Sequence, residues 1–257
     1  MLKTLRSLLV ALLVGAIAGQ LSAVTIVNET FADGERQLAQ PPESLAWVTS
    51  QTAAIQVENG ALVVRPSNVK QAMHVVAHFT EPGASVKLER GKPLKLTVEF
   101  TPGRILEGTR HGLRIGLFDS RNDVRLTQDR LNPEVAYAGY AVSINPAPQA
   151  AGALVAYRRV TNKDGRLLTN SGAYEKLADN KNAQALRAGQ RYTATLELAL
   201  TRSDRVAVKF SLEGPGLKNY GLEIGDKEKA STSFDTIGLS FYQSCPEVTI
   251  HRVRLSN

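Results

Sequence analysis

Alternation of apolar and polar residues with a period of two is the feature that most constrains how this chain can fold. Residues 94–100 read LKLTVEF, which places the apolar side chains on one side and Lys, Thr and Glu on the other. The same alternation recurs in residues 192–200 and 206–212, on either side of the turn-like segment 202–205. A period of two is typical of a strand that buries one side against a core. These segments therefore predict strands, and the last two predict a hairpin.

Strand-like segments extend over nearly all of the chain after residue 23. The other candidates are residues 24–31, 53–57, 61–65, 72–79, 112–118, 137–145, 153–161, 217–225, 234–242 and 247–255. Turn residues such as Asn59-Gly60 and Gly214-Pro215-Gly216 separate them. Only residues 175–188 could form a helix, and Asp179-Asn180-Lys181-Asn182 would keep it short or broken. This pattern predicts an all-β fold, a two-sheet antiparallel β-sandwich of the jelly-roll type, formed by one domain over residues 24–257.

The last predicted strand changes parity along its length. Val248 and Ile250 belong to one side, whereas Val253 and Leu255 belong to the other. One inserted residue shifts the register of a strand by one. We therefore expect a β-bulge near His251-Arg252.

Residues 1–23 have the pattern of a secretory signal peptide. Lys3 and Arg6 precede an apolar segment, residues 8–18, and small residues such as those of Leu21-Ser22-Ala23 follow it. The apolar segment is shorter than the roughly 20 residues that a membrane-spanning helix requires, and no later segment is apolar for long enough. We expect the peptide to be removed and the protein to be secreted or periplasmic. An uncleaved N-terminal anchor is the alternative.

Cys245 is the only cysteine, so the chain can form no intrachain disulfide. An exported domain without disulfides depends on its core, and a domain of this size buries enough surface to be stable without them. Cys245 precedes a proline at the end of a predicted strand. We expect a buried structural thiol.

The chain carries a formal net charge of +7. Lys3 and Arg6 account for two of these charges, so residues 24–257 carry +5, spread along the sequence. Outside the cytoplasm, such a surface suits an anionic polysaccharide or the cell envelope better than nucleic acid. A basic surface without a dedicated partner is the alternative.

Several stretches resemble largely uncharacterised exported proteins of polysaccharide-degrading bacteria. They are the mature start, residues 31–36 and 41–47, and the segments Arg114-Ile115-Gly116-Leu117-Phe118, Tyr137-Ala138-Gly139-Tyr140 and Ser233-Phe234-Asp235-Thr236-Ile237-Gly238-Leu239. At the level of the fold, the chain is similar to the concanavalin A-like lectin and glucanase sandwiches. That superfamily includes lectins, carbohydrate-binding modules, glycoside hydrolases and polysaccharide lyases, so the resemblance implies carbohydrate recognition without fixing an activity.

The sequence departs from these relatives at two places. Many of them end in a strand with Asp-Asn-Val, sometimes near a structural calcium ion, where this chain has His251-Arg252-Val253. The sequence therefore predicts no cofactor, and a structural calcium ion is an alternative that these residues do not support. The glucanases carry two glutamates close together on one strand, whereas Glu197 and Glu223 stand alone here.

Residues that could bind or cleave an acidic polysaccharide occur on the predicted strands. A polysaccharide lyase requires a Tyr, His or Lys base and a cationic or amide group that neutralises the substrate carboxylate. In a binding cleft the same side chains would stack on sugar rings and pair with carboxylate or sulfate groups. The candidates for either role are His111, Arg114, Tyr137, Tyr140, Tyr157, Arg158 and Tyr242. Which of them would be catalytic is unknown at this point, and for each a structural role is the alternative.

Other chemistries find little support. His74 and His78 would share one side of a strand but lie about 13 Å apart at about 3.3 Å per residue, so they predict no metal site. No strand offers the pair of carboxylates, roughly 5 to 9.5 Å apart, that glycosidases use. Trp47 could stack on a sugar, although its apolar neighbours favour packing against the core. The sequence shows no phosphate-binding loop and no zinc-ligand spacing.

Three functions remain open. The first is a secreted carbohydrate-binding β-sandwich that recognises an extracellular, anionic polysaccharide. The second is a glycan-active enzyme, foremost a polysaccharide lyase. The third is a structural or adhesive envelope protein without a glycan site.

Overall fold

The computed structural model describes most of the chain after the predicted signal peptide. The described residues are 23–37, 39–51, 54–68, 72–106, 112–120, 124–130, 135–147, 154–160, 167–168, 172–229, 231–242 and 244–257. Residues 1–22, which contain most of the predicted signal peptide, lie outside this part of the chain. Within it, no helix is long and apolar enough to cross a membrane.

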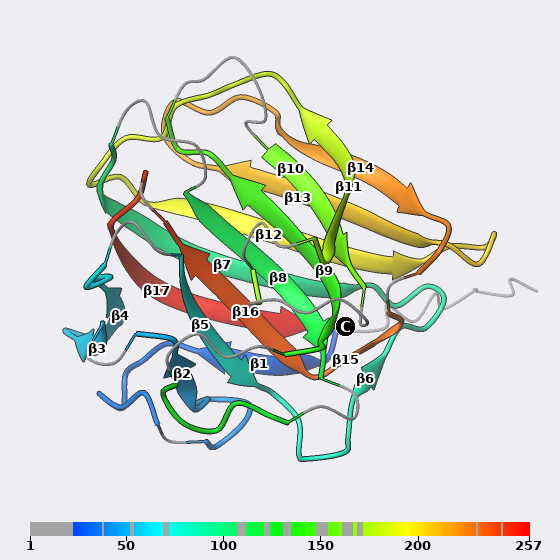
Figure 1. The fold of residues 1–257 in the computed structure, drawn as a ribbon, viewed down its shortest axis with the longest axis horizontal. Coiled ribbons are helices and arrows are strands. Elements are labelled where there is room, and N and C mark those ends of the chain that lie inside the picture. The colour runs from blue at the N-terminus through cyan, green and yellow to red at the C-terminus, as the bar shows by residue number, and fades with distance from the viewer. Residues whose placement is uncertain are drawn as a thin grey trace, which may run out of the picture.

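Two large antiparallel sheets and one small one make up the fold (Figure 1). The first has eight strands, in the order β14 (Tyr220–Asp226), β13 (Val206–Glu213), β12 (Tyr192–Leu200), β7 (Leu94–Arg104), β17 (Glu247–Ser256), β4 (Ala61–Val64) and β3 (Ile55–Glu58), with β1 (Thr25–Glu29) also paired to β17. The second has seven, in the order β11 (Tyr174–Asn180), β10 (Leu154–Arg159), β9 (Ala138–Ile144), β8 (Leu113–Asp119), β16 (Thr236–Phe241), β5 (Met73–His78) and β2 (Trp47–Thr49). A two-stranded sheet joins β15 (Ser233–Phe234) to β6 (Val86–Lys87).

The predicted all-β sandwich is confirmed. The hairpin predicted from residues 192–212 is the β12–β13 pair. The bulge predicted near His251-Arg252 is present, because the β17–β7 register shifts between Ile250 and Arg252. The helix allowed at residues 175–188 is wrong: β11 occupies the first part of this segment, and the rest is irregular.

The main core lies between the two sheets and takes in the alternating apolar side chains of both. Trp47 belongs to this core, where it is fully buried and packs against Phe31 with ring centres 6.1 Å apart. Cys245 is also buried, and burial raises the pKa of its thiol to about 12. The sequence-based interpretations of Trp47 and Cys245 as core residues are therefore confirmed.

A second apolar cluster covers the opposite side of the seven-stranded sheet, which we call the outer face. It consists of Val48, Val76, Phe118, Leu126, Val135, Tyr137, Ala141, Leu167 and Leu168. Because the sheet is covered on both sides, every residue of β8, β9 and β16 is buried. The outer face is thus partly covered by connecting segments, and those segments shape the candidate site.

Candidate functional site

Arg114 lies in the middle of the outer face. The strand register places side chains of five neighbouring strands in one row, which runs His74, Ser240, Arg114, Ser143 and Val155. The neighbouring residues of β8, Leu113 and Ile115, belong to the core between the sheets. The strand alternation therefore places a guanidinium on the outer face, flanked by small hydroxyl side chains.

Tyrosine rings surround this guanidinium. Arg114 is only 6% exposed, donates through Nη1 to the carbonyl of Leu168 at 2.6 Å, and lies 5.8 Å from the centre of the Tyr157 ring. Burial lowers the pKa of Arg114, and the nearby Tyr174, Tyr157 and Tyr242 act in the opposite direction. An arginine remains charged even when its pKa falls somewhat. The outer face therefore holds a fixed positive charge directly beneath half-buried aromatic rings.

A second arginine extends this arrangement along the sheet. Arg159, two residues after Tyr157, is fully buried and lies 5.8 Å from the centre of the Tyr174 ring. The rings of Tyr157 and Tyr174 meet edge to face, 6.0 Å apart at 83°. Arg159 donates to the carbonyls of Val135 and Tyr137, which keeps its guanidinium in place. We call Arg114, Tyr157, Arg159 and Tyr174 the arginine–tyrosine cluster.

Two glycines form the floor next to this cluster. Gly116 and Gly238 are opposite each other on β8 and β16. A Cβ atom on Gly116 would lie 2.6 Å from the Phe118 ring, and one on Gly238 would lie 2.9 Å from the same ring and 3.0 Å from Leu168. The missing side chains allow Phe118 and Leu168 to lie directly on the sheet, beside the arginine–tyrosine cluster.

Residues 124–130, which we call the strap, cross the other half of the outer face. Leu126 of the strap packs with Val48 and Val76 of β2 and β5. Tyr137 accepts a hydrogen bond from Leu126 N and donates one to Val124 O, at 3.2 and 2.9 Å. At the far end, Asp129 pairs with Arg36 at 2.8 Å and accepts from Thr49 N at 3.0 Å. The strap therefore has fixed contacts along its length.

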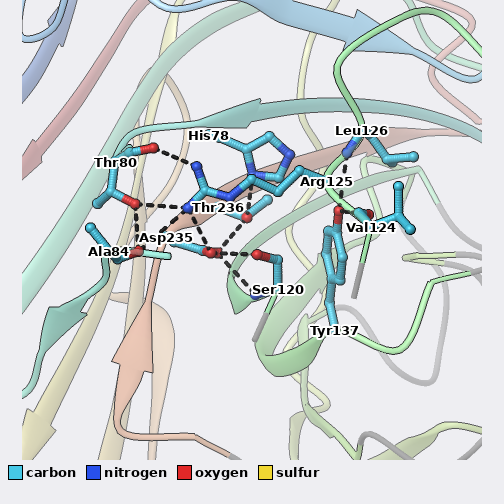
Figure 2. Close-up of polar contacts among 10 residues, drawn as sticks. All are labelled: His78, Thr80, Ala84, Ser120, Val124, Arg125, Leu126, Tyr137, Asp235 and Thr236. Atoms are coloured by element: carbon cyan, nitrogen blue, oxygen red, sulfur yellow. Dashed lines mark hydrogen bonds and ion pairs between the residues drawn. The ribbon is translucent and has the colours of Figure 1, made fainter. Parts of the chain in front are cut away.

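Arg125 attaches the strap to the end of the sheet, as Figure 2 shows. Its guanidinium turns away from the strap towards Thr80, Ala84 and the carboxylate of Asp235. Asp235 is almost fully buried, and its carboxylate also accepts hydrogen bonds from Ser120 N at 2.9 Å and from the Thr236 hydroxyl at 2.6 Å. This end of the outer face is therefore held by a charged, hydrogen-bonded network.

His78 belongs to the same network and is neutral. Burial, and then the positive charge of Arg125, lower the pKa of His78 to about 4. Its Nδ1 lies 2.8 Å from the Thr236 hydroxyl oxygen. Because the single hydroxyl proton of Thr236 is used on Asp235, we assign the Nδ1 proton to His78 as the donor in this contact. His78 therefore stabilises the network without carrying charge at neutral pH.

The structure brings together some of the residues that the sequence singled out and separates others. Arg114, Tyr157 and Tyr242 lie near one another on the outer face. Tyr137 is fully buried beneath the strap, where it links the strap to Arg159. His111 lies outside the described residues.

Tyr140 and Arg158, two of the candidates for a binding or catalytic role, do not belong to this face. Both point to the core side of the seven-stranded sheet, where they meet the buried carboxylate of Asp226 in β14. The Tyr140 hydroxyl donates to Asp226 at 2.9 Å, and Arg158 pairs with it at 2.7 Å. Arg158 also pairs with Glu175 at 2.5 Å and with Glu228 at 2.6 Å. This group connects the two sheets.

Two members of the arginine–tyrosine cluster were missed by the sequence analysis. Tyr174 stands directly before the segment interpreted as a possible helix, which concealed its place on a strand. Arg159 was overlooked in favour of Arg158, although it shares its parity with Tyr157. The period-two pattern could have found Arg159, because residues two apart on a strand face the same side.

His74 and His78 lie on the outer face of β5, as the strand pattern predicted. In the described part of the chain, no three His, Cys, Asp or Glu side chains are grouped so that they could hold a metal ion. His251 lies 2.9 Å from the Thr101 hydroxyl, and Arg252 donates to Asn28 at 3.0 Å.

Comparisons with known proteins identify the fold. No family model and no curated protein matches the chain. Among solved structures, the exoplasmic/lumenal domain of VIP36 is similar in its metal-free form (TM-score 0.56, 11% identity, 91% of this chain and 92% of that one) and in a form described as Ca²⁺/Man-bound (0.55, 12%, 91% and 90%).

Two further lectin structures are similar. They are the metal-free forms of lectin I-B4 from Griffonia simplicifolia (TM-score 0.51, 14% identity, 91% of this chain and 99% of that one) and of the Emp46p carbohydrate recognition domain (0.52, 13%, 86% and 93%). The chain therefore has the concanavalin A-like jelly-roll sandwich fold of legume-type lectins, as the sequence resemblance implied. The resemblance to exported bacterial proteins is not supported by these comparisons.

Proposed function

We propose that this chain is an exported carbohydrate-binding β-sandwich that recognises an anionic polysaccharide through the outer face of its seven-stranded sheet. The arginine–tyrosine cluster is the observation that carries the proposal. Tyr157, Tyr174 and Tyr242 are half-buried, so none of the three residues is fully shielded from solvent. Aromatic side chains that combine an apolar ring with a polar hydroxyl suit the mixed surface of a sugar.

The charge beneath the rings favours an acidic polymer. Arg114 and Arg159 place two guanidinium groups directly under Tyr157 and Tyr174. Attraction between opposite charges is stronger near a low-dielectric surface than in bulk water. The net positive charge of the chain acts in the same direction at longer range. Carboxylated or sulfated polysaccharides are therefore the proposed class of ligand.

Solved structures of the same fold support carbohydrate recognition. VIP36 is described in forms bound to Ca²⁺ and mannose-containing ligands, and the similar part of Emp46p is described as a carbohydrate recognition domain. The lumenal origin of the VIP36 domain also agrees with a chain that functions outside the cytoplasm, as its N-terminal sequence predicts. The ligand class of this chain still rests on its own residues, because the identity to these lectins is low.

Tyr174 of the cluster suits binding better than it suits lyase chemistry. A lyase base must accept a proton near neutral pH, which a tyrosine does best when its pKa is lowered. Burial instead raises the pKa of Tyr174, and its hydroxyl accepts a hydrogen bond from Leu168 N at 2.9 Å. The Tyr174 ring is therefore held in place, which suits ligand binding, and its hydroxyl is unsuited to abstract a proton.

Native affinity electrophoresis of the mature protein tests the proposal. Gels would contain alginate, ulvan, pectin, fucoidan or a neutral β-glucan, with a gel lacking polymer as the reference. We expect one or more of the anionic polymers to retard the protein and the neutral glucan to leave its migration unchanged. Retardation by the neutral glucan alone would contradict the anionic ligand class, and no retardation in any gel would favour a structural envelope protein. Shortening of the retarding polymer on incubation would favour a glycan-active enzyme instead.

A further inference from the structure

We propose that the Arg125 guanidinium serves as a built-in cation that holds the strap on the outer face, so that this face is assembled without calcium. The proposal concerns how the face is held in place, and it does not depend on which ligand the face binds. It starts from the atoms that surround the guanidinium at the end of the sheet (Figure 2).

Four oxygen atoms from two segments, residues 80–84 and Asp235, converge on Arg125. Nη1 donates to the carbonyl of Thr80 at 2.5 Å, and Nη2 lies 3.0 Å from the Thr80 hydroxyl and 3.4 Å from the carbonyl of Ala84. Nη2 also pairs with the carboxylate of Asp235 at 3.1 Å. The strap, the segment after β5 and the residue before β16 are thereby joined through one charged group.

These oxygens are of the kinds that calcium binds. Ca²⁺ takes carboxylate, hydroxyl-type and backbone carbonyl oxygens, usually six to eight of them. Here the N–H groups of the Arg125 guanidinium contact four such oxygens, one of which belongs to a carboxylate. The planar fork of an arginine can satisfy several acceptors at once and stays charged when partly buried. These oxygens are therefore already paired with a cation, the Arg125 guanidinium.

The carboxylates at this end of the sheet do not fit an additional calcium ion. Both oxygens of Asp235 are in use, because its carboxylate accepts from Ser120 N, from the hydroxyls of Ser120 and Thr236, and from Arg125. Asp119, which lines the same polar hollow as Asp235, accepts from the Ser231 hydroxyl at 2.9 Å. VIP36, of the same fold, is described in Ca²⁺-bound and metal-free forms.

Arg125 also lies where it can control the rest of the strap. Leu126, the next residue, donates its amide to Tyr137, and Tyr137 accepts a hydrogen bond from Arg159 of the arginine–tyrosine cluster. At the other end, Arg130 N donates to the carbonyl of Thr49 at 3.1 Å. Loss of the Arg125 contacts should therefore release the Leu126 end first.

Hydrogen exchange of the Leu126 and Arg130 amides tests this inference without any glycan. In the wild-type protein we expect each amide to exchange as slowly in the presence of EDTA as in the presence of excess calcium. In Arg125→Gln we expect the Leu126 amide to exchange about ten to a hundred times faster, because hydrogen bonds to charged groups contribute about 1.5–3 kcal/mol. Arg202→Gln, which removes an exposed arginine on the β12–β13 turn, is the matched control and should behave like the wild type.

Two results would overturn the inference. One is wild-type protection of Leu126 that depends on calcium and disappears with EDTA. The other is Arg125→Gln with wild-type exchange at Leu126. If Arg125→Gln exposes the amides of β7 as well, the fold has opened as a whole, and Arg125→Lys is used in its place. The lysine keeps the positive charge but lacks the planar fork of donors. We expect this variant to exchange faster at Leu126, with exchange in β7 unchanged. Because this experiment contains no polysaccharide, a result that contradicts the role of Arg125 leaves the proposed carbohydrate recognition untouched.

Discussion

At the scale of single residues, the arginines differ in what their guanidinium groups meet. Arg114 and Arg159 lie against tyrosine rings, whereas Arg125 and Arg158 lie against buried carboxylates. Arginine suits all four positions because its fork of donors can satisfy carbonyls, carboxylates and aromatic faces with little loss of charge. This difference in partners distinguishes the arginines for which we propose a ligand-binding role from those that hold the structure together, and composition alone could not distinguish them.

His78 makes the stability of the fold depend on pH. The pKa of His78 is about 4 in the folded protein and ordinarily 6.5, so the unfolded chain takes up a proton between these values and the folded chain does not. The free energy of unfolding should therefore fall as the pH falls from 6.5 to 4, by up to about 3 kcal/mol, and be unaffected by His78 above this window. Urea unfolding of the wild type and of His78→Gln across this range measures the effect.

Carboxylates titrate in the same window, so only the difference between the two proteins reports on His78. We expect the unfolding free energy of His78→Gln to depend less steeply on pH than that of the wild type. Parallel curves for the two proteins would show that His78 is charged in the folded state and that the proposed neutral hydrogen bond to Thr236 is wrong.

At the scale of the elements, the floor of the outer face depends on two glycines. Gly116→Ala would place a Cβ atom 2.6 Å from the Phe118 ring and 2.8 Å from the carbonyl of Tyr140. The strand backbone cannot move away easily, so we expect a loss of about 1–3 kcal/mol in the free energy of unfolding, as for other overpacked sites. Chemical denaturation measures the loss.

Gly172→Ala is the control, because a Cβ atom there meets nothing within 4 Å. Its stability should stay within about 0.5 kcal/mol of the wild type, as for most surface substitutions. If both alanine variants were as stable as the wild type, Phe118 would have to move aside freely, and the packing described for the outer face would be incorrect.

The sequence predicted the strands of the eight-stranded sheet better than the face that carries the candidate site. In β7, β12 and β13 one side is buried and the other is open, so apolar and polar residues alternate visibly. In β9 every residue is buried, so the sequence does not indicate that Tyr140 faces the core between the sheets. In β11 both sides are half-covered, and the segment was interpreted as a possible helix.

The candidate site was predicted only in part for the same reason. Arg114 and Tyr157 could be recognised as residue types that suit an acidic glycan, but their meeting depends on the register of β8, β9 and β10. The strap contacts join residues such as Arg36 and Asp129 that lie far apart in the chain. Such contacts between distant residues cannot be predicted from a single sequence.

At the scale of the whole molecule, Arg158 connects the two sheets. It lies in the seven-stranded sheet and pairs with Asp226, a residue of the eight-stranded sheet that is only 2% exposed. Arg158→Gln would remove the guanidinium that pairs with this carboxylate, and loss of one partner of a buried pair costs about 3–5 kcal/mol. We expect a large fall in the free energy of unfolding, measured with urea, and polysaccharide retention unchanged for the protein that remains folded.

Glu223→Gln provides the comparison, because Glu223 lies on the exposed side of β14 and should contribute little. Loss of polysaccharide retention in folded Arg158→Gln would show that the sequence-based assignment of Arg158 to the binding site was correct. Unchanged stability would show that the charged group does not hold the sheets together.

The most direct test of the central claim compares three proteins in one affinity gel: the wild type, Tyr157→Ala and Tyr157→Phe. The polymer is the anionic polysaccharide that retards the wild type most. If the outer face binds it, Tyr157→Ala should bind at least about fivefold more weakly, because truncation of a central aromatic side chain costs more than about 1 kcal/mol. Tyr157→Phe keeps the ring over Arg114 and should retain most of the affinity. Equal retardation of folded wild type and Tyr157→Ala would contradict the account, because the polysaccharide would then bind elsewhere on the molecule.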